Sequence, residues 1–240
     1  MFVLIGFLLL LAGLAAGSET PAVSFLAQAD AAYAQRSDLP QARIALLYYE
    51  KAIGAAPADI EASWKASRAA WWLGENADSN SEKIAYFQKG ISFSQKVLAR
   101  RPDCVEAHFW LGVNDASYGE VHRALKSLFL LKPIRHEMAE VLRLNDRYSG
   151  GGAYRVLGVV DYKVPGFAGG SKKRSLKELN QALAIDPQDP FTRYHLAEYF
   201  MRVGDKEKAE AERNTLQSLR VPSESLPELR MLQEKAKKLF

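Results

Sequence analysis

Hydrophobic residues recur at three- and four-residue spacings along most of the chain after residue 20. Clear examples are SEKIAYFQKGISFSQKVLAR at 81–100 and SLKELNQALAI at 175–185. This spacing places apolar side chains on one face of a helix, and the Ala, Leu, Lys, Glu, Gln and Arg that dominate the chain favour helices. The nearest candidate for a strand is YRVLGVVDYKV at 154–164, whose β-branched content leaves it ambiguous. The pattern predicts an all-α protein.

Three helical segments end in the same way. YEKAIGAAPAD at 49–59, SQKVLARRPD at 94–103 and LNQALAIDPQD at 179–189 each close with an aliphatic residue followed by a proline, which stops a helix. The distances between these prolines fit a unit of about 34 residues with insertions. We place the insertions at the polar stretch 74–80 and at 127–138 and 163–173, where Pro or Gly is expected to interrupt helices.

These units resemble the tetratricopeptide repeat (TPR), a family of paired antiparallel helices. The segment 190–221 matches best, with Leu196 at the family's Leu position, Gly204 in the turn and Ala209 at the close-packed Ala position. Small residues let helices cross closely. The resemblance implies a right-handed α-solenoid of about five helical hairpins over 22–222.

The domain division follows from the same resemblance. Leu-Gly pairs recur at Leu111-Gly112 and Leu157-Gly158, in phase with the other units. We therefore expect one repeat domain at 18–222. The tail at 223–240 reads as an amphipathic C-terminal capping helix, which the ends of solenoids need.

One segment, 150–187, also resembles the T-component proteins of TRAP transporters, which couple degenerate TPR helices to periplasmic transport of organic ligands. The shared features are a glycine-rich start, an aromatic residue with Leu-Gly, two glycine turns, basic residues and a helix that ends in Asp-Pro. In this chain they are Gly150 to Gly152, Tyr154, Leu157-Gly158, Lys163 to Gly166, Gly169-Gly170, Lys172 to Arg174 and Asp186-Pro187. The lipid-attachment cysteine of that family is missing here. The resemblance implies a periplasmic binding or adaptor role.

The first 17 residues, MFVLIGFLLLLAGLAAG, contain no charged side chain. A short apolar run that ends in small residues, here Ala15, Ala16 and Gly17, is typical of a cleaved secretory signal. The run is shorter than the about 20 residues of a membrane span, and the alternatives are a retained N-terminal anchor or a buried core helix. We expect a periplasmic or otherwise exported protein that reaches the membrane only through this segment, if it is not cleaved.

The resemblance to the TPR also implies a binding surface, because the first helices of the units line the concave face of the superhelix. The family's concave positions fall here on a mixture of aromatic, aliphatic and cationic residues. Our candidate binding residues are Lys65, Trp72, Phe109, Arg155, Tyr162, Lys163, Tyr194 and Arg202. Such a mixture suits a partner protein or a small apolar acid. The alternative is that these side chains pack against insertions or the tail helix.

A second candidate site is the loop before the basic helix at 172–185. Gly169, Gly170 and Ser171 are followed by Lys172 and Lys173. The N–H groups and the positive dipole end of a helix favour anions, whereas cations there are unfavourable unless an anion binds. The sequence therefore allows an anion loop at 169–173, and a solvated basic loop is the alternative. The Gly-Lys-Ser/Thr end of a phosphate loop is missing.

Composition excludes several other functions. The chain is 48% hydrophobic, which is too apolar for disorder, and its single cysteine, Cys104, excludes a disulfide framework. The 32 basic and 28 acidic residues are spread along the chain, so no nucleic-acid partner is indicated. His136 and Glu140 have a spacing that could bind zinc, but a surface polar pair is the simpler interpretation. We predict no metal and no cofactor.

The sequence thus leads to a non-enzymatic, exported TPR adaptor or binding protein, similar to the transporter T-component. It would hold a partner protein, such as a periplasmic solute receptor, or a small apolar organic acid in its concave face. The alternative is a general peptide-binding scaffold for envelope assembly or secretion. An enzyme that uses the glycine-rich region is the third hypothesis.

Overall fold

The computed structural model describes residues 20–122 and 125–239, apart from the side chains of residues 125–127. Within these ranges the chain forms eleven α-helices, two short 3-10 helices and no strand. The elements are α1 Pro21–Ala34, α2 Leu39–Ala55, α3 Ile60–Glu75, α4 Asn80–Leu98, α5 Val105–Val121, α6 Leu125–Asn145, α7 Tyr148–Lys163, η1 Gly166–Ala168, α8 Lys172–Ile185, α9 Pro190–Val203, α10 Lys206–Ser218, η2 Ser223–Ser225 and α11 Leu226–Lys237.

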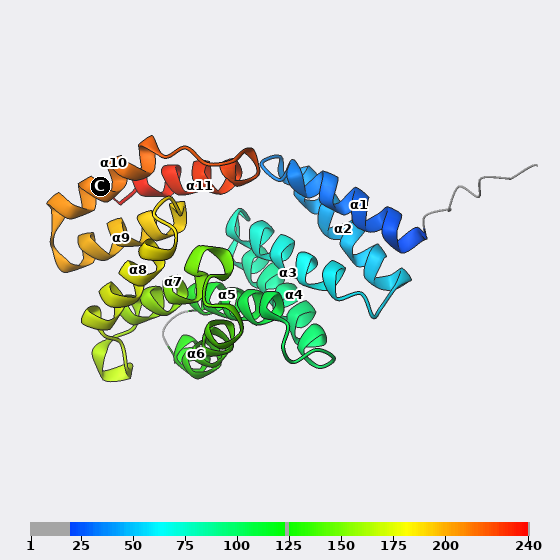
Figure 1. The fold of residues 1–240 in the computed structure, drawn as a ribbon, viewed down its shortest axis with the longest axis horizontal. Coiled ribbons are helices and arrows are strands. Elements are labelled where there is room, and N and C mark those ends of the chain that lie inside the picture. The colour runs from blue at the N-terminus through cyan, green and yellow to red at the C-terminus, as the bar shows by residue number, and fades with distance from the viewer. Residues whose placement is uncertain (1–19, 123–124, 240) are drawn as a thin grey trace, which may run out of the picture.

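The first ten α-helices form five consecutive hairpins that follow one another along an arc (Figure 1). The helix α11 packs against α9 and α10 after the last hairpin. The prediction of an all-α solenoid of about five hairpins with a C-terminal capping helix is confirmed for the described residues. The ambiguous segment 154–164 is helical up to Lys163, within α7.

The helix ends follow local sequence signals. The prolines Pro57, Pro102 and Pro187 come shortly after the last residues of α2, α4 and α8. New helices then start at capping side chains: an Asp59 carboxylate oxygen accepts the N–H groups of residues 61 and 62, and Ser79 Oγ accepts that of residue 82. Such caps satisfy N–H groups that the first turn of a helix leaves unpaired.

Small residues lie where the helices cross. A Cβ atom on Gly158 would stand 2.8 Å from Leu179 Cγ, so α7 and α8 touch only because this position has no side chain. The predicted close-packed Ala209 is fully buried. Gly204 has a φ of 87° in the turn between α9 and α10, a conformation that glycine adopts without steric cost. Gly158, Ala209 and Gly204 therefore have the packing and turn roles that the resemblance to the TPR implies.

One expected interruption is wrong. Pro133 lies inside α6, which runs from Leu125 to Asn145 without a break. Pro133 is exposed, whereas Ile134, Met138 and Val141 of the same helix are buried. Water can therefore satisfy the carbonyl that loses its N–H partner, while the apolar face keeps the helix docked on α5. Of the other two expected insertions, 74–80 contains the turn between α3 and α4, and 163–173 forms a loop with η1.

The arc closes on itself at its open side. In Figure 1 the connection from α10 to α11 reaches the turn between α1 and α2, and α11 starts there and runs back across the open side of the arc. Arg36 in that turn donates from Nε to Glu228 Oε1 at 2.8 Å and from Nη2 to Glu228 Oε2 at 2.5 Å. The tail therefore belongs to the same body as the five hairpins.

The predicted signal or anchor at residues 1–17 lies outside the described residues and stays a prediction. Among the helices of the described part, none combines the length and the hydropathy that a membrane span requires.

Candidate functional site

A chamber with a volume of about 510 Å³ lies on the concave side of the solenoid. The first helices of hairpins two to five line it, with Trp71 from α3, Val113 from α5, Val159 from α7 and Tyr194 from α9. Met231 of α11 adds a wall from the C-terminal side. The sequence predicts that first helices face inwards, but the contribution of the tail helix is visible only in the structure.

One wall of the chamber is aromatic. The ring centres of Trp71 and Trp110 are 5.6 Å apart, and those of Trp71 and Phe191 are 5.9 Å apart. Phe109 stands edge-on to Trp110 at 5.2 Å. Rings at these separations attract one another. The side chains from α3, α5 and α9 therefore pack into one continuous apolar surface.

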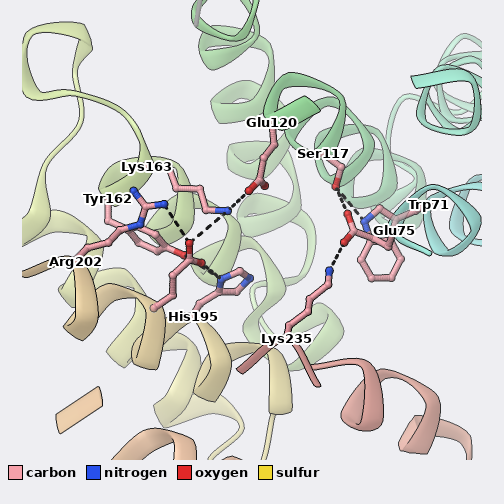
Figure 2. A network of polar contacts seen from close by, with 10 residues as sticks. Trp71, Glu75, Ser117, Glu120, Tyr162, Lys163, His195, Arg202 and Lys235 are labelled. Carbon is pink, nitrogen blue, oxygen red and sulfur yellow. Dashed lines mark hydrogen bonds and ion pairs between the residues drawn. The ribbon is translucent and has the colours of Figure 1, made fainter. Parts of the chain in front are cut away.

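The polar rim has two separate networks (Figure 2). In the first, Lys235 of α11 donates from Nζ to Glu75 Oε2 at 2.5 Å, and Ser117 Oγ donates to Glu75 Oε1 at 3.2 Å. Trp71 Nε1 donates to the same Ser117 hydroxyl at 3.2 Å. Burial raises the pKa of Glu75, but Lys235 outweighs it and lowers the pKa overall. An ionised Glu75 therefore holds the end of α11 against α3.

The second network is centred on Glu198 of α9. Tyr162 OH donates to Glu198 Oε2 at 2.6 Å, and Arg202 Nη2 donates to Oε1 at 3.2 Å. Lys163 Nζ lies 3.9 Å from the same Oε1. Burial raises the pKa of Glu198, but the hydrogen bond from His195 and the charge of Lys163 lower it well below the usual range. Glu198 is thus a permanent anion with its charge already compensated.

Burial also shifts the pKa values of two other members of this network, His195 and Tyr162. Burial lowers the pKa of His195, although Glu198 acts against this effect. Burial and the neighbouring carboxylate raise the pKa of Tyr162 well above its usual value. Near neutral pH both side chains are uncharged, so neither offers a charge to a ligand. The network instead positions Lys163, whose Nζ also contacts Glu120 Oε1 at 2.6 Å.

A second cavity, of about 660 Å³, adjoins the chamber, and Trp71, Trp110, Ser149 and Phe191 line both. Its remaining walls come from α1, α3, the turn between α8 and α9, and the connection from α10 to α11. Arg68 of α3 is among its lining residues.

The predicted binding residues divide into three groups. Phe109, Arg155, Lys163 and Tyr194 line the chamber, and Tyr162 and Arg202 belong to the network beside it. The other two lie elsewhere. Trp72 is buried and donates from Nε1 to the carbonyl of Arg36 at 2.9 Å, and Lys65 pairs with Asp30 at 2.7 Å and Glu61 at 2.6 Å.

Arg155 lines the chamber mainly as a structural element. It is 6% exposed, and its Nη1 donates to Asp189 Oδ2 at 2.6 Å. The same Asp189 oxygen accepts the N–H of Thr192 at the start of α9. Because Arg155 and Asp189 join α7 to the first turn of α9, substituting Arg155 perturbs stability as well as recognition.

The residues that sequence reasoning missed are Trp71, Trp110, Phe191, Arg68 and the α11 side chains. The family's concave positions select Trp72, whereas the neighbouring Trp71 faces the chamber. Helical phase is uncertain by one residue in a degenerate repeat, so periodicity alone does not separate these two tryptophans. No local signal in the tail sequence indicates that α11 packs against the concave side of the solenoid.

The loop at 169–173 is held by its own contacts. Ser171 Oγ accepts the N–H of Arg174, whose Nη2 donates to the Gly169 carbonyl at 2.6 Å and to Asp161 Oδ1 at 2.9 Å. A Cβ on Gly170 would collide with the Val164 carbonyl, so this close approach requires glycine. Lys172 and Lys173 are exposed. Anion binding at this loop stays a prediction.

The remaining candidates have structural surroundings. Within the described ranges, no group of three or more His, Cys, Asp or Glu side chains is arranged to hold a metal ion. Cys104 is buried, and burial raises the pKa of its thiol to about 11. This thiol is therefore protonated at neutral pH.

Fold and chamber together define the class: this is a TPR-like helical repeat protein. The structure is similar to that of TTC0263, a TPR protein of Thermus thermophilus, with a TM-score of 0.66 and 20% identity over 90% of this chain and 99% of that chain. It also resembles the MamA protein, with a TM-score of 0.48 and 15% identity over 90% of this chain and 94% of that chain.

The family follows from the sequence itself. Residues 25–166 match the family described as regulator of microtubule dynamics protein 1-3, and the chain belongs to that family. The match runs from α1 to the start of η1 and covers the first three hairpins and α7. No curated protein matches the chain. The family is a different one from the transporter component that 150–187 resembles.

Proposed function

We propose that this chain is a non-enzymatic binding protein whose chamber holds a small apolar organic acid. The observation that carries the proposal is the chamber itself: an aromatic wall of Trp71, Trp110 and Phe191, a charged rim, and a volume of about 510 Å³. Ligand sites for small molecules are concave, mainly apolar and about 300–1,000 Å³ in size. The chamber has all three properties.

The contribution of α11 favours a small molecule over an extended peptide. Met231, Leu232 and Lys235 line the chamber opposite α5 and α7. A peptide groove of a solenoid stays open along its length, whereas here the tail helix crosses it and is held by Glu75 and Arg36. A ligand that fits inside needs no displacement of the tail.

A filling substitution tests this function. Ala116 lines the chamber, so Ala116→Phe places a ring in its volume without removing a core contact. We expect the affinity for dodecanoate, measured by quenching of tryptophan fluorescence and by calorimetry, to fall at least about tenfold. The matched control is Ala139→Phe on the exposed side of α6, which should leave binding unchanged. Equal binding by both variants would reject the chamber as the site.

The finer form of the proposal is export and a role beside a TRAP-type transporter. The apolar segment 1–17 and the resemblance at 150–187 support it. N-terminal sequencing of protein recovered outside the cytoplasm should start near Ser18, and a retained Met1 would favour the anchor instead. Co-purification with a periplasmic solute receptor encoded beside this chain would support the transport role.

The description of the family favours a second candidate, an adaptor that acts on a protein assembly. Its members are described as regulators of microtubule dynamics. Co-sedimentation of this chain with polymerised tubulin, compared with unpolymerised tubulin, tests whether the description extends to it. Absence of the chain from the microtubule pellet at low salt would reject this candidate.

A further inference from the structure

Arg68 is a partly buried cation for which the described residues show no acidic partner. None of the ion pairs among the described residues includes Arg68, and its Nε is buried without a hydrogen-bond partner. Its guanidinium carbon lies 4.1 Å from the centre of the Tyr33 ring and 5.3 Å from that of Trp64. Burying a charge is costly unless it is paired, so this arrangement calls for an explanation.

Five acidic residues line the second cavity with Arg68, and three of them, Asp30, Asp189 and Glu228, pair with other cations. Asp30 accepts from Lys65 Nζ at 2.7 Å and from Tyr49 OH at 2.7 Å. Asp189 pairs with Arg155, and Glu228 pairs with Arg36. The other two, Asp186 and Glu224, accept from the N–H of Gln188 and from Ser223 Oγ. No ion pair among the described residues joins any of the five carboxylates to Arg68, so the cation keeps its capacity for an outside anion.

The surroundings of Arg68 keep it charged. Burial lowers its pKa, but the tyrosines Tyr33 and Tyr49 outweigh this effect and raise the pKa overall. Aromatic faces stabilise a guanidinium without neutralising it. An Arg that is fixed by rings and lacks a carboxylate is preorganised to bind one, because its planar fork matches the two oxygens.

The position of Arg68 links this charge to the apolar chamber. Arg68 lines the cavity of about 660 Å³ that shares Trp71, Trp110 and Phe191 with the chamber. A molecule that crosses from one cavity to the other passes from a cation to an aromatic wall. A ligand that matches both cavities therefore has an anionic head group followed by an apolar chain.

We propose that Arg68 binds the carboxylate of a small amphipathic acid, whose hydrocarbon part extends past Trp71 and Trp110 into the chamber. The proposal rests on the proposed function and adds the residue that reads the acid group. Lys163 and Lys235 of the chamber rim already contact Glu120 and Glu75, so Arg68 is the better anchor.

The experiment compares two probes of equal chain length, dodecanoate and dodecanol, on the full chain and on three variants. Arg68→Gln removes the charge, and Arg68→Lys keeps it without the fork. Arg43→Gln removes an arginine charge from the exposed side of α2 and is the matched control. Affinity is measured by calorimetry and by tryptophan quenching, and folding is checked by circular dichroism.

We expect wild type and Arg43→Gln to bind dodecanoate more tightly than dodecanol. Arg68→Gln should lose about 10- to 100-fold in affinity for dodecanoate, the effect of a charge-assisted hydrogen bond, with little change for dodecanol. Arg68→Lys should fall between the two. Equal affinity of the wild type for both probes would overturn the role of Arg68, whether or not Arg68→Gln folds.

The outcomes separate this inference from the proposed function. If dodecanoate binds the wild type and Arg68→Gln equally, while Ala116→Phe abolishes binding, then the chamber is the site and Arg68 is not its anchor. If neither probe binds the wild type, both proposals fail. Tight binding of dodecyl phosphate with no binding of dodecanoate would overturn the carboxylate as the ligand group.

Discussion

The contact between Arg36 and Glu228 is the clearest place to test how the arc is closed. Glu228 belongs to the first turn of α11, and the side chains of Arg36 and Glu228 are 6% and 13% exposed. Removing one partner of a buried ion pair leaves the other charge uncompensated and costs about 3–5 kcal/mol. Arg36 also donates to the carbonyls of Tyr33 and Glu224, so we expect the lower end, about 3 kcal/mol, for Glu228→Gln.

This loss should appear first in α11, because Glu228 joins only that helix to the α1–α2 turn. About 3 kcal/mol corresponds to roughly a 100-fold increase in the open population. Hydrogen exchange of the peptide 226–237 should therefore accelerate by about that factor, while α5 keeps its protection. The control is Glu234→Gln, whose exposed pair with Lys237 contributes little. Equal exchange in the two variants would refute the idea that this contact holds the tail.

Two further predictions concern the interior. Burial raises the pKa of Asp115 to about 7, and Glu137 adds to the shift. The folded state therefore disfavours the ionised carboxylate, so the free energy of unfolding falls as the pH rises from about 4 to 7. In urea titrations Asp115→Asn should raise the free energy of unfolding by up to about 4 kcal/mol at pH 8 but not at pH 4. Gly158→Leu should lower Tm through a clash with Leu179 costing about 1–3 kcal/mol, and an unchanged Tm would contradict the close crossing of α7 and α8.

Most of the fold could be read from local signals. The prolines after α2, α4 and α8, the turn at Gly204 and the three- and four-residue spacing all act within one or two helical turns, and the structure agrees with them. The exception is Pro133, which the sequence reads as a break. Its outcome depended on which side of α6 faces water, and that is settled by packing against α5.

The candidate site was predictable only in part. First helices were expected to face inwards, and Phe109, Lys163 and Tyr194 line the chamber. The sequence selected Trp72 for the binding surface, whereas Trp71, the preceding residue on α3, lines the chamber. Arg155 has the expected position, but its pairing with Asp189, 34 residues further along the chain, could not be predicted from spacing.

The sequence by itself determined the helices and their pairing into hairpins, because these depend on contacts between residues close along the chain. Only the tertiary structure decided that α11 starts beside the α1–α2 turn, which acidic groups are already paired and that Arg68 lacks an acidic partner among the described residues. Such facts depend on residues up to 192 positions apart, and the curvature accumulated over five hairpins determines which of them meet.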